Sequence, residues 1–281
     1  MRRFHLFLAS LAVAAVAALT FTSSRVQAIT YGFVDTNNVF QNTGAFIVKS
    51  PTTGRIFPIC SGTLIAPDVF LTASHCTVFF ENDLAPRGFT AFVSFDQSIP
   101  FGALTVPQTN LIPVTQVVSN PNYNQRQSDT GDIAVLLVDA QDTQGVTPAT
   151  LPTAGLLDQI AAQNGLKRAV FAPVGYGLQN RVVGGGVPYF QDVNPIPRMY
   201  AFASFNALNP TFLRLSQNPA TGNGGACYGD SGGPNFFNYN NTLVLAAITI
   251  TGDAVCRATN VAYRLDTVSA RHFLAPHLTL P

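Results

Sequence analysis

Short runs of β-branched and aromatic residues, separated by clusters of turn-forming residues, recur along the chain from Gly44 onward. The runs cover residues 45–48, 62–65, 69–72, 90–95, 114–118 and 133–138, and then 169–174, 198–205, 211–215, 243–251 and 260–265. Many short strands at this spacing are typical of β-barrels and β-sandwiches. The sequence therefore predicts an all-β protein in two halves, linked near residues 140–166.

Helical periodicity is scarce. Apolar residues recur at helical spacing only in residues 154–164 and in the C-terminal stretch 267–274. We expect two short helices at these places.

The N-terminus has the pattern of a secretory signal. Met1-Arg2-Arg3 supplies positive charge, an apolar run follows at residues 6–21, and Val26-Gln27-Ala28 offers a small-x-small cleavage site. The run is shorter than the roughly 20 residues of a spanning helix and is rich in Ala. We expect residues 1–28 to be a signal peptide, residues 29–281 to be secreted, and no membrane association after cleavage.

Charge excludes some partners. The formal net charge is +1 and only 10% of residues are charged, so no strong field is available to attract nucleic acid. We expect a monomer.

Four cysteines fit an exported chain that forms disulfide bonds, and three pairings are possible. A bond between Cys60 and Cys76 would pin the loop between them. The Cys and His spacings do not match a zinc site, and we expect neither a metal nor another cofactor.

The segment from Ala226 to Pro234, A-C-Y-G-D-S-G-G-P, is the strongest local signal. A serine hydroxyl needs a base to become a nucleophile, and the oxyanion that it creates needs donors. Glycines around Ser231 let the N–H groups of Gly229 and Ser231 converge on one point. The same residues also match G-x-S-x-G of lipases and esterases, with Asp253 or Asp266 and His272 in the required order.

A candidate base lies upstream, in T-A-S-H-C around His75, between an apolar strand and a cysteine. Asp132 opens the apolar run D-I-A-V-L-L, where a buried carboxylate needs a partner. An imidazole that it orients is a natural partner.

These three segments, in this order, resemble the chymotrypsin/trypsin family over essentially everything after the signal. The resemblance implies two packed six-stranded antiparallel β-barrels with a short C-terminal helix, the first at about residues 29–145 and the second at about 165–266. It implies a catalytic triad in which Ser231 attacks the scissile carbonyl, His75 serves as general base and then acid, and Asp132 orients the imidazole.

Further residues follow from the resemblance. Cys227 should pair with Cys256, and Gly229 and Ser231 should supply the oxyanion-hole amides. Ile29, as a new N-terminus, resembles the activated terminus whose amino group pairs with the Asp before the catalytic Ser, here Asp230.

The specificity pocket resembles the family's only in part. Gly225 occupies the position at its base, with Gly252 as a wall and Asn260 at its border, so an uncharged side chain is expected in it. Ile250 and Thr251 replace the Ser and the aromatic residue usual on the adjoining strand.

Ser74 replaces an Ala next to His75, a departure from which we expect no chemical consequence. The resemblance implies a secreted serine endopeptidase that acts on protein or peptide substrates through an acyl-enzyme. The alternatives are a serine esterase of G-x-S-x-G type and a catalytically silent protease-like binding protein.

Overall fold

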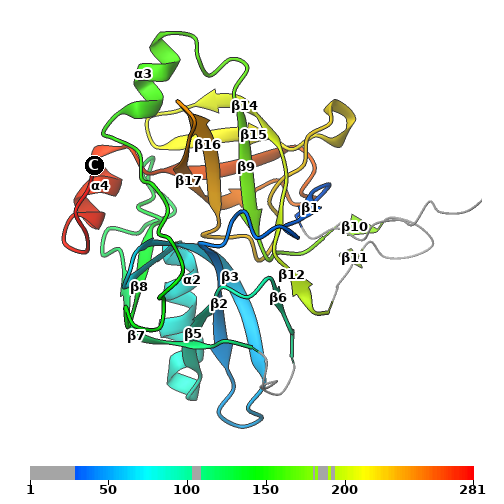
Figure 1. The fold of residues 1–281 in the computed structure, drawn as a ribbon, viewed down its shortest axis with the longest axis vertical. Helices are drawn as coiled ribbons and strands as arrows, with labels where there is room; N and C mark the ends of the chain where they lie inside the picture. Colours follow the sequence, from blue (N-terminus) through cyan, green and yellow to red (C-terminus); the bar gives the residue numbers. More distant parts are fainter. Residues whose placement is uncertain (1–28, 103–108, 180, 183–188, 191–193) are drawn as a thin grey trace, which may run out of the picture.

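The computed structural model describes residues 29–102, 109–179, 181–182, 189–190 and 194–281. The predicted signal peptide at residues 1–28 therefore lies outside the described residues. Two β-barrels lie one above the other, with the C-terminal helix at their side (Figure 1). No helix among the described residues is both long enough and apolar enough to cross a membrane.

Six antiparallel strands close the first barrel in the order β2-β3-β4-β8-β7-β5. Their bounds are β2 (Thr43–Lys49), β3 (Ile56–Ala66), β4 (Val69–Thr72), β5 (Thr90–Ser94), β7 (Ile112–Ser119) and β8 (Ala134–Val138). The closed ring leaves no unpaired edge within the barrel.

The second barrel follows the order β9-β14-β15-β18-β17-β16, and a pairing of β9 with β16 closes it. Its strands are β9 (Val170–Gly175), β14 (Ala203–Leu208), β15 (Phe212–Ser216), β16 (Pro234–Tyr239), β17 (Thr242–Gly252) and β18 (Thr259–Arg264). The predicted pair of six-stranded antiparallel barrels is thus confirmed.

The N-terminal segment belongs with the second barrel, although the sequence placed it in the first. Strand β1 (Phe33–Val34) pairs with β13 (Met199–Tyr200), which in turn pairs with β9. Thr30 also bridges to Gly225. Further short pairs are β6 (Ser98–Ile99) with β12 (Ile196–Pro197), and β10 (Arg181–Val182) with β11 (Tyr189–Phe190).

Both predicted helices are present, as α3 (Leu156–Ala162) and α4 (Val268–Leu274). A third, α2 (Ser74–Phe79), was not predicted because six residues are too few to display helical periodicity. It continues into a π-helical turn, η1 (Phe80–Leu84), and a 3₁₀ turn, η2 (Ala85–Arg87). A further 3₁₀ turn is η3 (Pro219–Thr221).

One apolar cluster runs through the first barrel and across the seam into the second. It includes Phe46 and Phe70 of the first barrel, Phe236 and Tyr263 of the second, and Phe273 of α4. Burial of such large side chains contributes roughly 1.5–3 kcal/mol each. The two barrels therefore behave as parts of one packed body.

Arg198, fully buried beside β13, fastens three parts of the chain together. Its Nε atom lies 3.0 Å from Oδ2 of Asp35, which is 1% exposed. Its Nη1 atom donates to the carbonyl oxygens of Thr43 and Phe95, each at 3.1 Å, and Nη2 donates to Asn38. The guanidinium therefore ties the N-terminal segment and the first barrel to the sheet of the second.

Replacement of Arg198 by Met should destabilise the protein strongly. The change leaves the Asp35 carboxylate buried without its cation, a loss worth about 3–5 kcal/mol in comparable buried pairs. Urea unfolding would measure it, with the exposed Arg214→Met on β15 as the matched control, expected within about 0.5 kcal/mol of wild type. Equal effects of the two substitutions would contradict this role of Arg198.

Candidate active site

His75 lies in the first turn of α2, and Asp132 precedes β8, which pairs with β4. The Asp132 carboxylate receives two hydrogen bonds from His75, one from the backbone N–H at 2.9 Å and one from ring Nδ1 at 2.8 Å. Because a carboxylate only accepts, Nδ1 carries a proton, so in the neutral ring Nε2 has the lone pair. The side chain of Asp132 is 5% exposed and that of His75 is 25% exposed, so of the two only the His75 ring is appreciably open to solvent.

The Ser74 hydroxyl makes two buried hydrogen bonds that could not be predicted from the sequence. Ser74 is fully buried, and its Oγ donates to the carbonyl of Ile133 at 2.7 Å and accepts from the N–H of Asn120 at 3.1 Å. It thereby joins the residue before His75 to the residue after Asp132. An Ala at this position could make neither bond, so Ser74 has a structural role, and its lack of weight in the chemistry remains a prediction.

Ser231 follows a tight turn rather than a strand, and two glycines shape that turn. Gly229 has φ +95°, which disfavours any residue with a side chain, and Gly232 has φ +78°. A Cβ on Gly232 would lie 2.2 Å from Thr72 Oγ1, so the turn lies directly against the end of β4.

The backbone of Ser231 is fixed beside the residue that follows His75. Its carbonyl oxygen accepts from the N–H of Ser61 at 2.9 Å and lies 4.0 Å from Sγ of Cys76. The structure thus brings the two predicted segments together at the seam between the barrels.

The carbonyl groups around Ser231 are each engaged. Tyr228 O accepts from Leu178 N at 2.6 Å, and Asp230 O accepts from Gly233 N at 2.9 Å. In a trans peptide the N–H points opposite to the carbonyl, so these bonds orient the N–H groups of Gly229 and Ser231. Within the described part of the chain, neither of these two N–H groups donates a hydrogen bond.

Asp230 is fully buried next to β9. Its Oδ1 accepts from Gly177 N at 2.7 Å and its Oδ2 from Cys227 N at 2.8 Å. Burial raises the pKa of Asp230 to about 7, although these two hydrogen bonds lower it in part. Ile29, the predicted partner of Asp230, is fully buried and packs with Met199 and Ala201.

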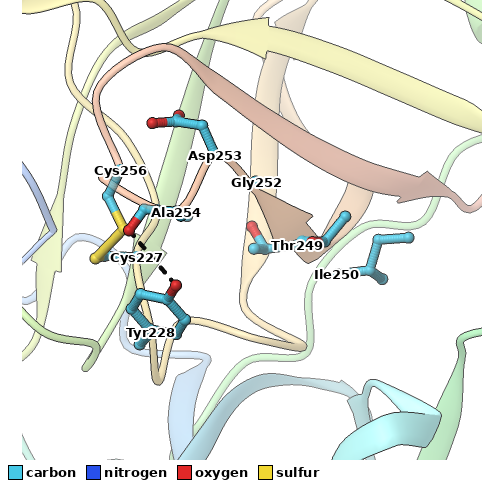
Figure 2. Close-up of a pocket in the computed structure, with 10 residues that line it drawn as sticks. Cys227, Tyr228, Thr249, Ile250, Gly252, Asp253, Ala254 and Cys256 are labelled. Carbon is cyan, nitrogen blue, oxygen red and sulfur yellow. Dashed lines mark hydrogen bonds between the residues drawn. A yellow bond between two sulfur atoms is a disulfide. The ribbon is translucent and has the colours of Figure 1, made fainter.

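A cavity of about 210 Å³ lies beside the 226–228 segment and the end of β17 (Figure 2). Its lining includes Gly252 and Ile250, and a role of Gly252 in substrate binding remains a prediction. Tyr228 reaches across toward the 253–256 loop, where its hydroxyl lies 3.5 Å from the carbonyl oxygen of Ala254 (Figure 2).

The lining of this cavity also contains Asp253, whose carboxylate we did not predict there from the sequence. Its oxygens accept from the N–H groups of Arg257, Ala258 and Thr259 at 2.8–3.0 Å and from the Gln217 side chain at 3.2 Å. Partial burial opposes its ionisation, but these hydrogen bonds outweigh burial and lower the pKa of Asp253. Its oxygens are therefore already engaged by the protein.

Gly225 and Asn260, the other predicted pocket residues, do not line this cavity. A Cβ on Gly225 would meet Oε1 of Gln217 at 2.3 Å, so the Gln217 side chain fills that space. Asn260 is 1% exposed, and its Nδ2 donates to Asn235 at 2.9 Å and to Thr249 at 3.3 Å. Their roles in substrate binding remain predictions.

The surroundings of Ser231 do not match the strand–serine–helix turn of the esterase alternative. The segment that follows is strand β16, not a helix. Asp266 is paired with Arg264, Asp253 is engaged as described, and His272 is exposed on α4. The order of residues that suggested this alternative therefore lacks its structural context.

Two disulfide bonds, Cys60–Cys76 and Cys227–Cys256, confirm the predicted pairings. The first joins β3 to α2 beside His75, and the second joins the Ser231 turn to the loop after β17. Each bond thus anchors one of the two segments that meet at the seam.

Comparisons with known proteins agree on the family. The family model described as Trypsin matches residues 33–270. Vitamin K-dependent protein C of Equus caballus is 28% identical over 157 residues, which are 53% of this chain and 94% of that sequence. The protein of the same name from Felis catus is 29% identical over 160 residues, with the same two coverages.

The stability of the protein should depend on pH through Asp230. Its folded-state pKa of about 7 lies above the ordinary value of 3.8, so between these values the folded state holds a proton that the unfolded state has released. Below pH 3.8 Asp230 therefore makes its full contribution to stability. This contribution is lost as the pH rises through about 7, so the free energy of unfolding falls by up to about 4 kcal/mol.

Denaturant unfolding at successive pH values, on a chain that retains residues before Ile29, would measure this decline. Asp230→Asn does not titrate, so the difference in stability between wild type and this variant should change across the same pH range. A constant difference would contradict the prediction.

Proposed function

The chain belongs to the trypsin family of serine proteases, and on that premise we propose that it is a secreted serine endopeptidase with His75, Asp132 and Ser231 as its catalytic triad. One observation carries the proposal: Asp132 holds the ring of His75 through Nδ1, which leaves Nε2 to act as a base. The position of the Ser231 carbonyl beside Cys76 supports it.

The proposed reaction proceeds through an acyl-enzyme. Nε2 of His75 takes the proton of the Ser231 hydroxyl as Oγ attacks the scissile carbonyl carbon, and Asp132 stabilises the charged imidazole. The N–H groups of Gly229 and Ser231 stabilise the tetrahedral oxyanion. His75 then gives the proton to the leaving amine. In the second half of the reaction, His75 takes a proton from the attacking water and returns it to Oγ of Ser231, which releases the acid product.

For specificity, we propose that the cavity near Gly252 accepts an uncharged side chain of the substrate. Thr249, Ile250 and Ala226 contribute to its lining, and the Asp253 carboxylate is engaged by backbone amides and Gln217. These bonds direct the Asp253 oxygens toward the 257–259 backbone and Gln217, so we assign this carboxylate to the loop and not to the substrate.

For activation, we propose that signal cleavage after Ala28 frees the amino group of Ile29 to pair with Asp230. The carboxyl of Asp230 forms no ion pair among the described residues, and burial raises its pKa to about 7. A chain that begins at Ile29 would then lose the decline in stability between pH 4 and 7, because the ammonium group lowers the pKa of Asp230. Persistence of the decline in that chain would refute this pairing.

The location outside the cell rests on the signal-like residues 1–28 and on the two disulfide bonds. Disulfides persist in oxidising compartments and are rare in the cytosol. The proposed partners are protein or peptide substrates, and the proposed chemistry uses side chains, two backbone N–H groups and water.

Removal of a triad member should lower turnover by about 10⁴-fold or more. A fluorophosphonate probe should label wild type at Ser231, and Ser231→Ala should not be labelled. His75→Ala should lose both labelling and peptide hydrolysis, whereas His272→Ala, an exposed histidine on α4, should keep both. Loss of activity in His272→Ala with retention in His75→Ala would instead favour the esterase.

Failure of the folded wild-type protein to react with any fluorophosphonate or peptide would favour the alternative of a protease-like binding protein. Hydrolysis of simple esters without hydrolysis of peptides would favour the esterase alternative. Both outcomes contradict the proposed endopeptidase.

A peptide library should be cut mainly after uncharged residues. The measurement is the sequence of the products that wild type releases from the library. Dominant cutting after Arg or Lys would overturn the proposed specificity and leave the proposed triad untouched.

A further inference from the structure

Ser61, in the middle of β3, is fully buried and uses every polar group that it has. Its N–H donates to the carbonyl of Ser231 at 2.9 Å, and its carbonyl accepts from the Thr72 hydroxyl at 2.9 Å. Its hydroxyl accepts from the N–H of Tyr176 at 3.0 Å and lies 3.0 Å from the carbonyl oxygen of Gly229. One first-barrel residue thus contacts the Ser231 turn twice and the end of β9 once.

The direction of each hydroxyl bond is determined by its partners. A backbone N–H can only donate and a carbonyl oxygen can only accept. The single hydroxyl proton therefore goes to Gly229, and an oxygen lone pair faces the N–H of Tyr176. A side chain without a hydroxyl would leave both buried backbone groups without this partner.

The peptide that Ser61 holds lies between the two candidate oxyanion donors. The Gly229–Asp230 peptide is fixed at one end by the Ser61 hydroxyl and at the other by the bond from Asp230 N to Cys227 O at 3.0 Å. Rotation of this peptide would change the angle between the N–H groups of Gly229 and Ser231. Gly229 has φ +95° and no side chain, so side-chain sterics restrain this peptide little and hydrogen bonds set its orientation.

We propose that the Ser61 hydroxyl is a positioning residue that keeps the amides of Gly229 and Ser231 converged on the oxyanion. The inference rests on the proposed function and adds to it a residue of the first barrel that touches neither substrate nor nucleophile through its side chain. Donors aimed at the oxyanion act mainly in the transition state. Loss of the hydroxyl should therefore lower kcat and leave KM nearly unchanged.

The test compares Ser61→Ala with Ser94→Ala. Ser94 is equally buried, lies in β5 of the same barrel, and its hydroxyl accepts a hydrogen bond from Asp96 N, away from the Ser231 turn. Thermal unfolding of both variants measures the general loss of stability. Kinetics with one good peptide substrate and inhibition by a matched peptide boronate, which forms a tetrahedral adduct on Ser231, measure the effect on the site.

We expect Ser61→Ala to lower kcat by about tenfold to a hundredfold, less than loss of an oxyanion donor itself, with KM within about twofold of wild type. The boronate should bind more weakly by a similar factor, and Ser94→Ala should change neither quantity by more than about twofold. Equal kcat values in the two variants, or a rise in KM alone, would overturn the inference.

If wild type neither cleaves peptides nor reacts with a fluorophosphonate, the proposed function fails, and hydrogen exchange decides on Ser61 separately. Backbone amides of residues 226–236 should then exchange at least about tenfold faster in Ser61→Ala than in Ser94→Ala. Indistinguishable exchange in the two variants would show that Ser61 does not hold the turn.

Discussion

The buried ion pair of Arg198 and Asp35 is the constraint on which the arrangement of the two barrels depends. An unpaired charge in this place would be costly, so the pair forms only when the N-terminal segment, the first barrel and the sheet of the second barrel are all in position. Apolar burial across the seam supplies most of the favourable free energy but has no preferred direction. The guanidinium, with its fixed donor geometry, selects one orientation.

That orientation matters because the candidate site is divided between the barrels. The first barrel holds His75 and Asp132 through strand pairing, the helix α2 and the hydroxyl of Ser74. The turn that carries Ser231 comes from the second barrel and is fastened to the first by Ser61. The site is therefore held by hydrogen bonds on both sides, as a preorganised set of donors requires.

Much of the fold and of the candidate site could be predicted from the sequence alone. Period and spacing indicated the strands, and three motifs indicated His75, Asp132, Ser231 and the family. The helix α2 was missed because six residues are too few to display helical periodicity and because its first turn is held by Asp132, which is 57 residues away in the sequence. The N-terminal segment was assigned to the wrong barrel because two residues of strand β1 carry no sign of the strand with which they pair.

The sequence by itself determined the all-β class, the order of the motifs and the chemical groups that the site contains, since these depend on local pattern and residue type. Only the tertiary structure decided that the hydroxyl groups of Ser61 and Ser74 hold the site. It also decided that Asp253 faces backbone amides and that Gln217 fills the space beside Gly225. The physical reason is that a hydrogen bond depends on distance and direction between atoms. Folding brings such atoms together from distant positions, as in the bond from Ser61 to Gly229, which are 168 residues apart in the sequence.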